Sequence, residues 1–430
     1  TSYSINSNEL LQARGATLGE QLKRVPGITS LNTGASIVKP VINGLHSNRL
    51  VVLNNGIRQE GQQWGSEHAP EIDPNSSEVV EVIQGPSSLQ YGPDAIGGVI
   101  LVSPKALPYY KKHEGWIKMS GNSNGWGGMT AAMLTGSFTK KRLNLHNNLR
   151  IKKSGSLAYR IHASGRINGT IHTPDYFMKN TALNETSFSG ALGYQKGGFT
   201  ADVFYSRFTT NLGIFSGSHI GNLTDLNAAF QATQPKDTGV FTYKINNPKQ
   251  FIQHQLTKAE LNYQWNLKVK SKLIYGYQYN LRQEYDIHKA YGDNSNENLP
   301  AFELNLWTNT LDAITEIKHN TYLKTIVGVS GMQQSNGYFG RYFIPNFKKI
   351  QGGAYYIGEL NVKNWLINWG LRYDATQLNV FVFENVHGMV SANKGLAYEA
   401  IQQDFIDEGY ELIFNQIIDL RVSCFKLNSR

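Results

Sequence analysis

Apolar and polar residues alternate with a period of two along most of the chain beyond residue 108, and this pattern constrains the fold more than any other feature. From Leu261 to Leu267 every second residue is apolar, and the residues between them are Asn, Gln and Asn. The stretches Leu273–Leu281 and Trp365–Tyr373 are built in a similar way. Because successive side chains of a β-strand point to opposite faces, the pattern predicts strands with one apolar and one polar face.

A soluble sandwich also alternates, so other features are needed to choose between a soluble and a membrane protein. Many of the stretches reach ten residues or more, against about five or six in globular sheets. Their apolar faces are rich in Trp and Tyr, as in aromatic girdles at membrane interfaces, and the opposite faces carry polar groups that a dry core would not satisfy. Connections are unequal, since Gly197-Gly198 is tight and Thr209–Gln250 is long and polar. The sequence therefore predicts a membrane all-β protein, a transmembrane antiparallel β-barrel.

Composition excludes several other classes. We find no run of the roughly 18 apolar residues that a membrane-spanning helix needs. The chain has 42 Gly and 23 Tyr but only 17% charged residues, which argues against disorder and against a charged helical bundle. The lone Cys424 excludes an internal disulfide framework. The net charge is +9, but the basic residues are scattered, and we interpret Lys140-Lys141-Arg142 as a turn or interfacial anchor rather than a nucleic-acid site.

Residues 1–108 have a different pattern, that of a small α/β unit with many turns. Thr17 and Glu20 have the spacing of a capping box, which predicts a helix that ends at Pro26-Gly27. Asn55-Gly56 predicts a tight turn between two strands. A folded domain that precedes a wide barrel can plug its lumen.

The first hundred residues also carry a series of short motifs in a fixed order. They are Leu18-Gly19-Glu20-Gln21-Leu22, Val25-Pro26-Gly27-Ile28, Asn43-Gly44-Leu45, Arg49–Gly56, Val80–Gly92 and Ile96–Ile100. In this order and spacing they resemble the plug domain of TonB-dependent outer-membrane receptors.

The resemblance implies a function in the outer membrane of a Gram-negative bacterium. Receptors of this family take up a scarce nutrient into the periplasm, with energy delivered by the TonB complex. The expected substrate is a metal ion or metal chelate, such as zinc or an iron siderophore, and the expected partners are TonB and outer-membrane lipid. The alternative is a surface receptor, adhesin or signalling receptor without transport. Nucleotide-binding, metalloprotease and nucleophile-elbow motifs are absent from the sequence, so we predict neither an enzyme nor a bound cofactor.

One loop of the expected plug, Gln59–Asp73, contains one His and four carboxylates. Imidazole and carboxylate ligands suit zinc or another first-row metal. The loop is similar to that of zinc-uptake receptors of the family, which implies Glu67 and His68 as metal ligands. The alternative is that these polar groups form hydrogen bonds within the plug or to the barrel wall. The predicted substrate-binding residues are Glu60, Trp64, Glu67, His68, Asp73 and, in the long loop, His219.

We expect three regions: a plug at 1–108, a partial barrel at 109–383 and an uncertain segment at 384–430. The family has barrels of 22 strands, whereas we count only about 12 or 13 strands here. The alternation fades beyond Glu384, and Tyr398–Leu420 is more typical of mixed or helical sequence. We therefore expect an incomplete receptor that lacks its leader and part of its barrel, and that does not insert or transport by itself.

Overall fold

The computed structural model describes residues 2–5, 17–33, 37–61, 68–138, 155–218, 223–235, 237–285, 299–340, 344–381, 410–414 and 424–427. Within these ranges, no helix has both the length and the apolar character to span a membrane.

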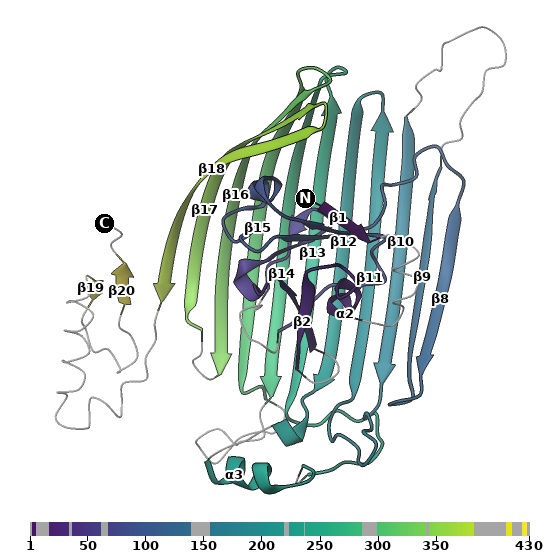
Figure 1. Ribbon diagram of the computed structural model, residues 1–430, viewed down its shortest axis with the longest axis vertical. Helices are drawn as coiled ribbons and strands as arrows, with labels where there is room; N and C mark the ends of the chain where they lie inside the picture. Colours follow the sequence, from purple (N-terminus) through teal and green to yellow (C-terminus); the bar gives the residue numbers. More distant parts are fainter. Residues whose placement is uncertain are drawn as a thin grey trace.

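An antiparallel sheet of eleven strands dominates the described part of the chain, and each strand pairs with its neighbours in sequence. The plug lies against one face of this sheet (Figure 1). The strands are β8 (Glu114–Asn122), β9 (Gly127–Ser137), β10 (Ser156–Asn168), β11 (Leu183–Lys196), β12 (Phe199–Gly213), β13 (Lys249–Gln264), β14 (Val269–Tyr285), β15 (Phe302–Lys318), β16 (Leu323–Gly340), β17 (Asn346–Val362) and β18 (Trp365–Phe381). The predicted transmembrane all-β architecture is confirmed.

The number of strands in this sheet is one or two below the twelve or thirteen expected. From β13 to β18 each strand has 16 to 18 residues. A membrane-spanning strand needs only about 9–11 residues. The strands therefore extend beyond the membrane, and fewer of them fit into the same length of chain.

The two faces of the sheet have opposite character. Trp365, Leu371 and Tyr373 are exposed on the outer face, where 73%, 76% and 76% of each residue is accessible. Gln278, Asn280 and Arg282 alternate with outward residues on β14 and are completely buried against the plug. An apolar outer face and a polar inner face are the arrangement that lipid outside and a plug inside require.

The plug contains a five-stranded sheet in the order β1-β6-β7-β4-β5, in which only β4 and β7 are parallel. A hairpin of β2 and β3 and the helix α2 pack beside it (Figure 1). The elements are β1 (Ser2–Ile5), α2 (Leu18–Leu22), β2 (Ile28–Thr33), β3 (Ile37–Ile42), the 3-10 helix η1 (Ser47–Arg49), β4 (Val51–Asn54), β5 (Ile57–Arg58), β6 (Val79–Ile83), the 3-10 helix η2 (Pro86–Tyr91) and β7 (Val99–Ser103). Leu22, Ile42, Val80 and Ile100 form the centre of its apolar core.

The start of α2 shows one half of the predicted capping box. The Glu20 amide donates to Thr17 Oγ1 at 3.3 Å, as expected for an N-cap. The Glu20 carboxylate instead pairs with Lys23 Nζ at 2.9 Å, one turn further along the helix. An exposed lysine three residues away competes with the Thr17 amide for this carboxylate.

The connections at the two ends of the sheet differ as the sequence predicted. At one end, the turns after β11, β13, β15 and β17 have two to four residues. At the other end, residues 214–248 form a long connection that contains η3 (Ser216–Ser218) and the helix α3 (Leu223–Gln231), which lies beyond the end of the strands (Figure 1). Short periplasmic turns and long extracellular loops are the pattern of outer-membrane barrels.

The segment 384–430 contains two short strands, β19 (Tyr410–Phe414) and β20 (Cys424–Leu427), which pair in antiparallel fashion. Within Tyr398–Leu420, which we interpret as mixed or helical sequence, the structure therefore describes a strand at 410–414. This stretch contains Tyr410, Ile413 and Phe414, and aromatic and β-branched residues favour strands. The remainder of that prediction lies outside the described residues.

Candidate functional site

The seam between the plug and the inner face of the sheet is the first part of the candidate site, and Glu71 lies at its centre. Arg282 Nη2 on β14 donates to Glu71 Oε1 at 2.9 Å, and the Asn280 amide donates to Glu71 Oε2. Arg282 Nη1 also donates to Gln250 Oε1 on β13 at 3.2 Å. Burial raises the pKa of Glu71, and the hydrogen-bonded guanidinium of Arg282 acts in the opposite direction. This carboxylate therefore depends on the barrel wall for its charge partner.

Asp73 and His68 join the same loop to the wall at two further points. Ser164 Oγ on β10 donates to Asp73 Oδ2 at 2.6 Å, and His162 Nδ1 lies 3.8 Å from that oxygen. His68 Nε2 lies 3.1 Å from Glu284 Oε1 on β14. Both plug residues are buried.

Glu60 is held at the next position along the seam. Its Oε1 pairs with Arg58 Nε at 2.6 Å, and its Oε2 accepts a hydrogen bond from Gln334 Nε2 on β16 at 3.1 Å. The Glu60 amide donates to Gln278 Oε1 on β14 at 3.0 Å. Glu60, His68 and Asp73 thus all contact the barrel wall. Such contacts are what we expect if the polar groups of this loop form hydrogen bonds to the wall instead of binding a metal.

The predicted site residues are only partly brought together. Glu60, His68 and Asp73 lie in the seam, and their role in substrate binding stays a prediction. Trp64, Glu67 and His219 lie outside the described residues. Among the residues that the structure does describe, no group of three or more His, Cys, Asp or Glu could hold a metal ion.

Lys39 on β3 provides a test of the seam's electrostatics. It is buried at 3% exposure, and burial together with the charge of Arg282 lowers its pKa to about 8. The pKa of Lys39 is lower in the folded protein than in the unfolded chain, so this group destabilises the fold while it is protonated in both. The full cost in stability is present below pH 8 and declines as the pH rises toward 10.5. We expect plug stability, measured by urea unfolding in micelles, to gain from this group between pH 8 and 10. Lys39→Met should lose that gain, whereas Lys23→Met, at an exposed site, should keep it.

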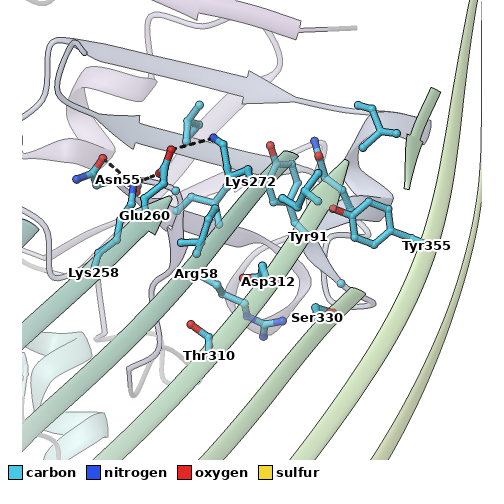
Figure 2. A pocket seen from close by; sticks show the side chains of 18 of the residues that line it. Asn55, Arg58, Tyr91, Lys258, Glu260, Lys272, Thr310, Asp312, Ser330 and Tyr355 are labelled. Carbon is cyan, nitrogen blue, oxygen red and sulfur yellow. Dashed lines mark hydrogen bonds and ion pairs between the residues drawn. The ribbon is translucent and has the colours of Figure 1, made fainter. Parts of the chain in front are cut away.

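A cavity of about 500 Å³ between the plug and the wall is the second part of the site. Side chains from both converge on it: Asn55, Arg58 and Tyr91 come from the plug, and the wall contributes side chains from six neighbouring strands (Figure 2). Among the described residues of its lining, five are basic and three are acidic. The wall side chains here are Lys258, Glu260, Lys270, Lys272, Thr310, Asp312, Glu316, Ser330, Tyr355 and Arg372.

Two basic side chains fasten the plug at the edges of this cavity. Lys258 Nζ donates to the Asn55 carbonyl at 2.7 Å and pairs with Glu260 Oε2 at 2.6 Å. Arg372 Nη1 on β18 donates to the carbonyls of Leu89 and Gln90 at 3.3 and 3.2 Å. These carbonyls are at the C-terminal end of η2, where a cation also interacts favourably with the helix dipole.

Sequence reasoning did not find this cavity. The signal that could have indicated it was charge on the polar faces of consecutive strands, for example Lys258 and Glu260 on one strand and Lys272 on the next. Alternation shows that these residues face inward, but it does not give the register that aligns them across strands.

Comparisons with known proteins agree with this arrangement. Residues 1–99 match the family described as TonB-dependent Receptor Plug Domain. The solved siderophore receptor PirA from Acinetobacter baumannii matches 88% of this chain with a TM-score of 0.62 at 15% identity. Residues 1–99 form a TonB-dependent receptor plug domain, and the described chain as a whole has the fold of solved receptors of this type. This fold, a plug against a wall of antiparallel strands, is that of bacterial outer-membrane receptors.

The chain matches its curated relatives over only part of its length. It is 32% identical to a hemin receptor of Yersinia pestis over 97 residues, which are 22% of this chain and 14% of that protein. It is 29% identical to the vitamin B12 transporter BtuB of Photobacterium profundum over 123 residues, 28% of this chain and 20% of that protein. The copper transporter OprC has the same fold, with a TM-score of 0.59 and 14% identity over 85% of this chain. The chain spans 58% of the PirA chain and 52% of the OprC chain.

Proposed function

We propose that the chain belongs to a TonB-dependent receptor that takes up a scarce nutrient across the outer membrane, and that TonB supplies the work that moves its plug. The plug occupies the inner face of the wall, so substrate passes only after plug and wall separate. The seam supports this proposal where the loop 59–73 meets the wall, because the contacts there are polar: Glu71, Asp73 and Glu60 contact the wall through hydrogen bonds. Water can replace such bonds on separation, so a polar seam opens at a lower net cost than an apolar core of equal area.

The substrate is, in this proposal, a metal ion or a metal chelate. The relatives and solved structures are named for hemin, vitamin B12, siderophores and copper, which all are or carry a metal. Whole-cell uptake that requires TonB is the measurement that tests the function. Cells that carry the full-length receptor but accumulate neither zinc, hemin nor cyanocobalamin would contradict it.

The metal ligands of this proposal are Glu67 and His68, and Glu284 of the wall is a further candidate. His68 Nε2 and Glu284 Oε1 are 3.1 Å apart. Two ligand atoms of a tetrahedral zinc, each about 2.0–2.1 Å from the metal, are separated by roughly 3.3 Å. A zinc ion could therefore bind both groups with little movement of either side chain. The pair joins plug and wall, so a bound metal would bridge the two parts.

Isothermal titration of the full-length receptor with zinc checks this assignment. We expect Glu67→Ala/His68→Ala and, separately, Glu284→Gln to weaken zinc binding by at least about tenfold. Glu359→Gln, which removes an exposed carboxylate of β17, serves as the matched control and should bind like the wild type. Equal affinity in all four proteins would exclude these ligands.

A further inference from the structure

Three connections at the long-loop end of the sheet are fastened together into one rim. The Gly169 amide donates to the Gly125 carbonyl at 2.8 Å, and the Thr170 amide donates to the Thr242 carbonyl at 2.9 Å. The Gly239 amide donates to the Phe177 carbonyl at 2.9 Å. Residues 123–126, 169–177 and 239–243 therefore form a preformed surface, although they are far apart in sequence.

This rim contains a hollow of about 470 Å³ with aromatic walls. His172 and Phe177 meet edge to face, with ring centroids 4.5 Å apart, and Phe241 lies 6.4 Å from Phe177. Trp126 closes the hollow on the side of the β8–β9 turn, and 71% of it is exposed. Tyr243 supports this turn through a 2.7 Å hydrogen bond from its hydroxyl to the Trp126 carbonyl.

The backbone at Trp126 is in an unfavourable conformation. Its φ is 45°, in the left-handed region that residues other than glycine rarely adopt. The turn around it is tight, since a Cβ at Gly125 would lie 2.5 Å from Asn168 Nδ2. Glycine or asparagine would relieve the strain at position 126, and a large exposed ring does not. Local strain combined with an exposed aromatic ring points to a contact outside the chain.

The lining of the hollow indicates the chemistry of that contact. Among the described residues that line it, none is Lys, Arg, Asp or Glu. A ligand with a net charge, such as an anionic chelate or a phosphate, would find no counter-charge there. Aromatic faces combined with the Ser123 hydroxyl and the His172 imidazole instead match a ligand with C–H faces and a hydroxyl rim.

We propose that this hollow binds a neutral saccharide, with one sugar face stacked on Trp126 or Phe241. The site is separate from the plug–wall seam, so it adds a second binding function to the proposed uptake. The saccharide comes either from a free glycan in the medium or from the sugar part of an envelope glycolipid beside the barrel. Both sources present the same ring chemistry to the hollow.

The test is isothermal titration of the full-length receptor in micelles with two probes. Maltohexaose represents a free glycan, and a neutral O-antigen oligosaccharide of lipopolysaccharide represents an envelope sugar. We expect Trp126→Asn, which tolerates the positive φ, and Phe241→Ala each to weaken binding by about tenfold. Trp265→Ala removes a 63% exposed ring at the opposite end of the sheet and should leave binding unchanged.

The two probes separate the sources, since binding of only one identifies which sugar the rim accepts. Heat-modifiable migration of each variant shows that its barrel is folded. Binding of neither probe to the wild type would overturn the proposal, and so would an equal loss of affinity in Trp265→Ala. Zinc, hemin or cobalamin uptake is measured separately, so a failure of the saccharide site is distinguishable from a failure of the transport function.

Discussion

A disulfide between positions 57 and 276 is expected to abolish uptake by the full-length receptor until it is reduced. A Cβ at Gly276 on β14 would lie 3.1 Å from Ile57 Cγ2 on β5 of the plug. Ile57 Cβ is one bond of about 1.5 Å further away, which brings the two Cβ atoms close to the separation of roughly 3.5–4.5 Å that disulfides use. The oxidising outer envelope favours formation of the bond. If the plug must move, Ile57→Cys/Gly276→Cys should hold it in the closed state.

The measurement is whole-cell uptake of zinc, hemin and cyanocobalamin, before and after addition of dithiothreitol. We expect uptake of the transported compound to fall by at least about a hundredfold and to recover on reduction, because the covalent tether is far stronger than the hydrogen bonds of the seam. The single variants Ile57→Cys and Gly276→Cys control for the crowding of Gly276 by Ile57 and Thr310. Full uptake by the oxidised double variant would show that β5 stays in place during transport.

The largest expected effect on stability comes from Arg282→Met. Glu71 and Arg282 are 3% and 0% exposed, and the substitution leaves the Glu71 carboxylate buried without its cation. Removing one partner of a buried ion pair costs about 3–5 kcal/mol. We expect that loss in the local stability of the plug loop, measured by hydrogen exchange of the amides at 57–61 and 68–73.

Two variants separate the loss of the charge pair from a general effect of substitution. Glu71→Gln/Arg282→Met removes both charges and should recover most of the stability, because no buried charge is left unpaired. Arg207→Ala removes an outward-facing arginine with one hydrogen bond, to Gln253, and should cost less than about 1 kcal/mol. A double variant as unstable as Arg282→Met would mean that the ion pair is not what holds the loop.

The sequence predicted the fold class well because the responsible signal is local. Alternation places Tyr275 and Tyr277 outward and Gln278 and Asn280 toward the plug, as found. The N-cap at Thr17 and the turn at Asn55-Gly56 are also local, and both are present. The strand at 410–414 was missed because a five-residue stretch at the end of an irregular region has too few residues to define a period.

The site was predicted only in part, for a different reason. Glu60, His68 and Asp73 stood out by composition, but their partners Gln334, Glu284 and Ser164 lie between 91 and 274 positions away. Glu71 was counted among the carboxylates of the loop and was not selected, although it makes the most buried ion pair of the seam. The local sequence does not show whether a carboxylate will pair with a distant arginine or remain exposed to solvent.

The sequence by itself determined which residues of each strand face outward and which family the motifs of the first hundred residues indicate. These properties depend on residue spacing along a single segment, and a strand's period of two is fixed by its backbone. Only the tertiary structure decided which strands border the plug loop, how Arg282 reaches Glu71, and that residues 123–126, 169–177 and 239–243 form one hollow. Those contacts depend on strand register and loop packing, which arise when distant segments meet and exclude water from their contacts.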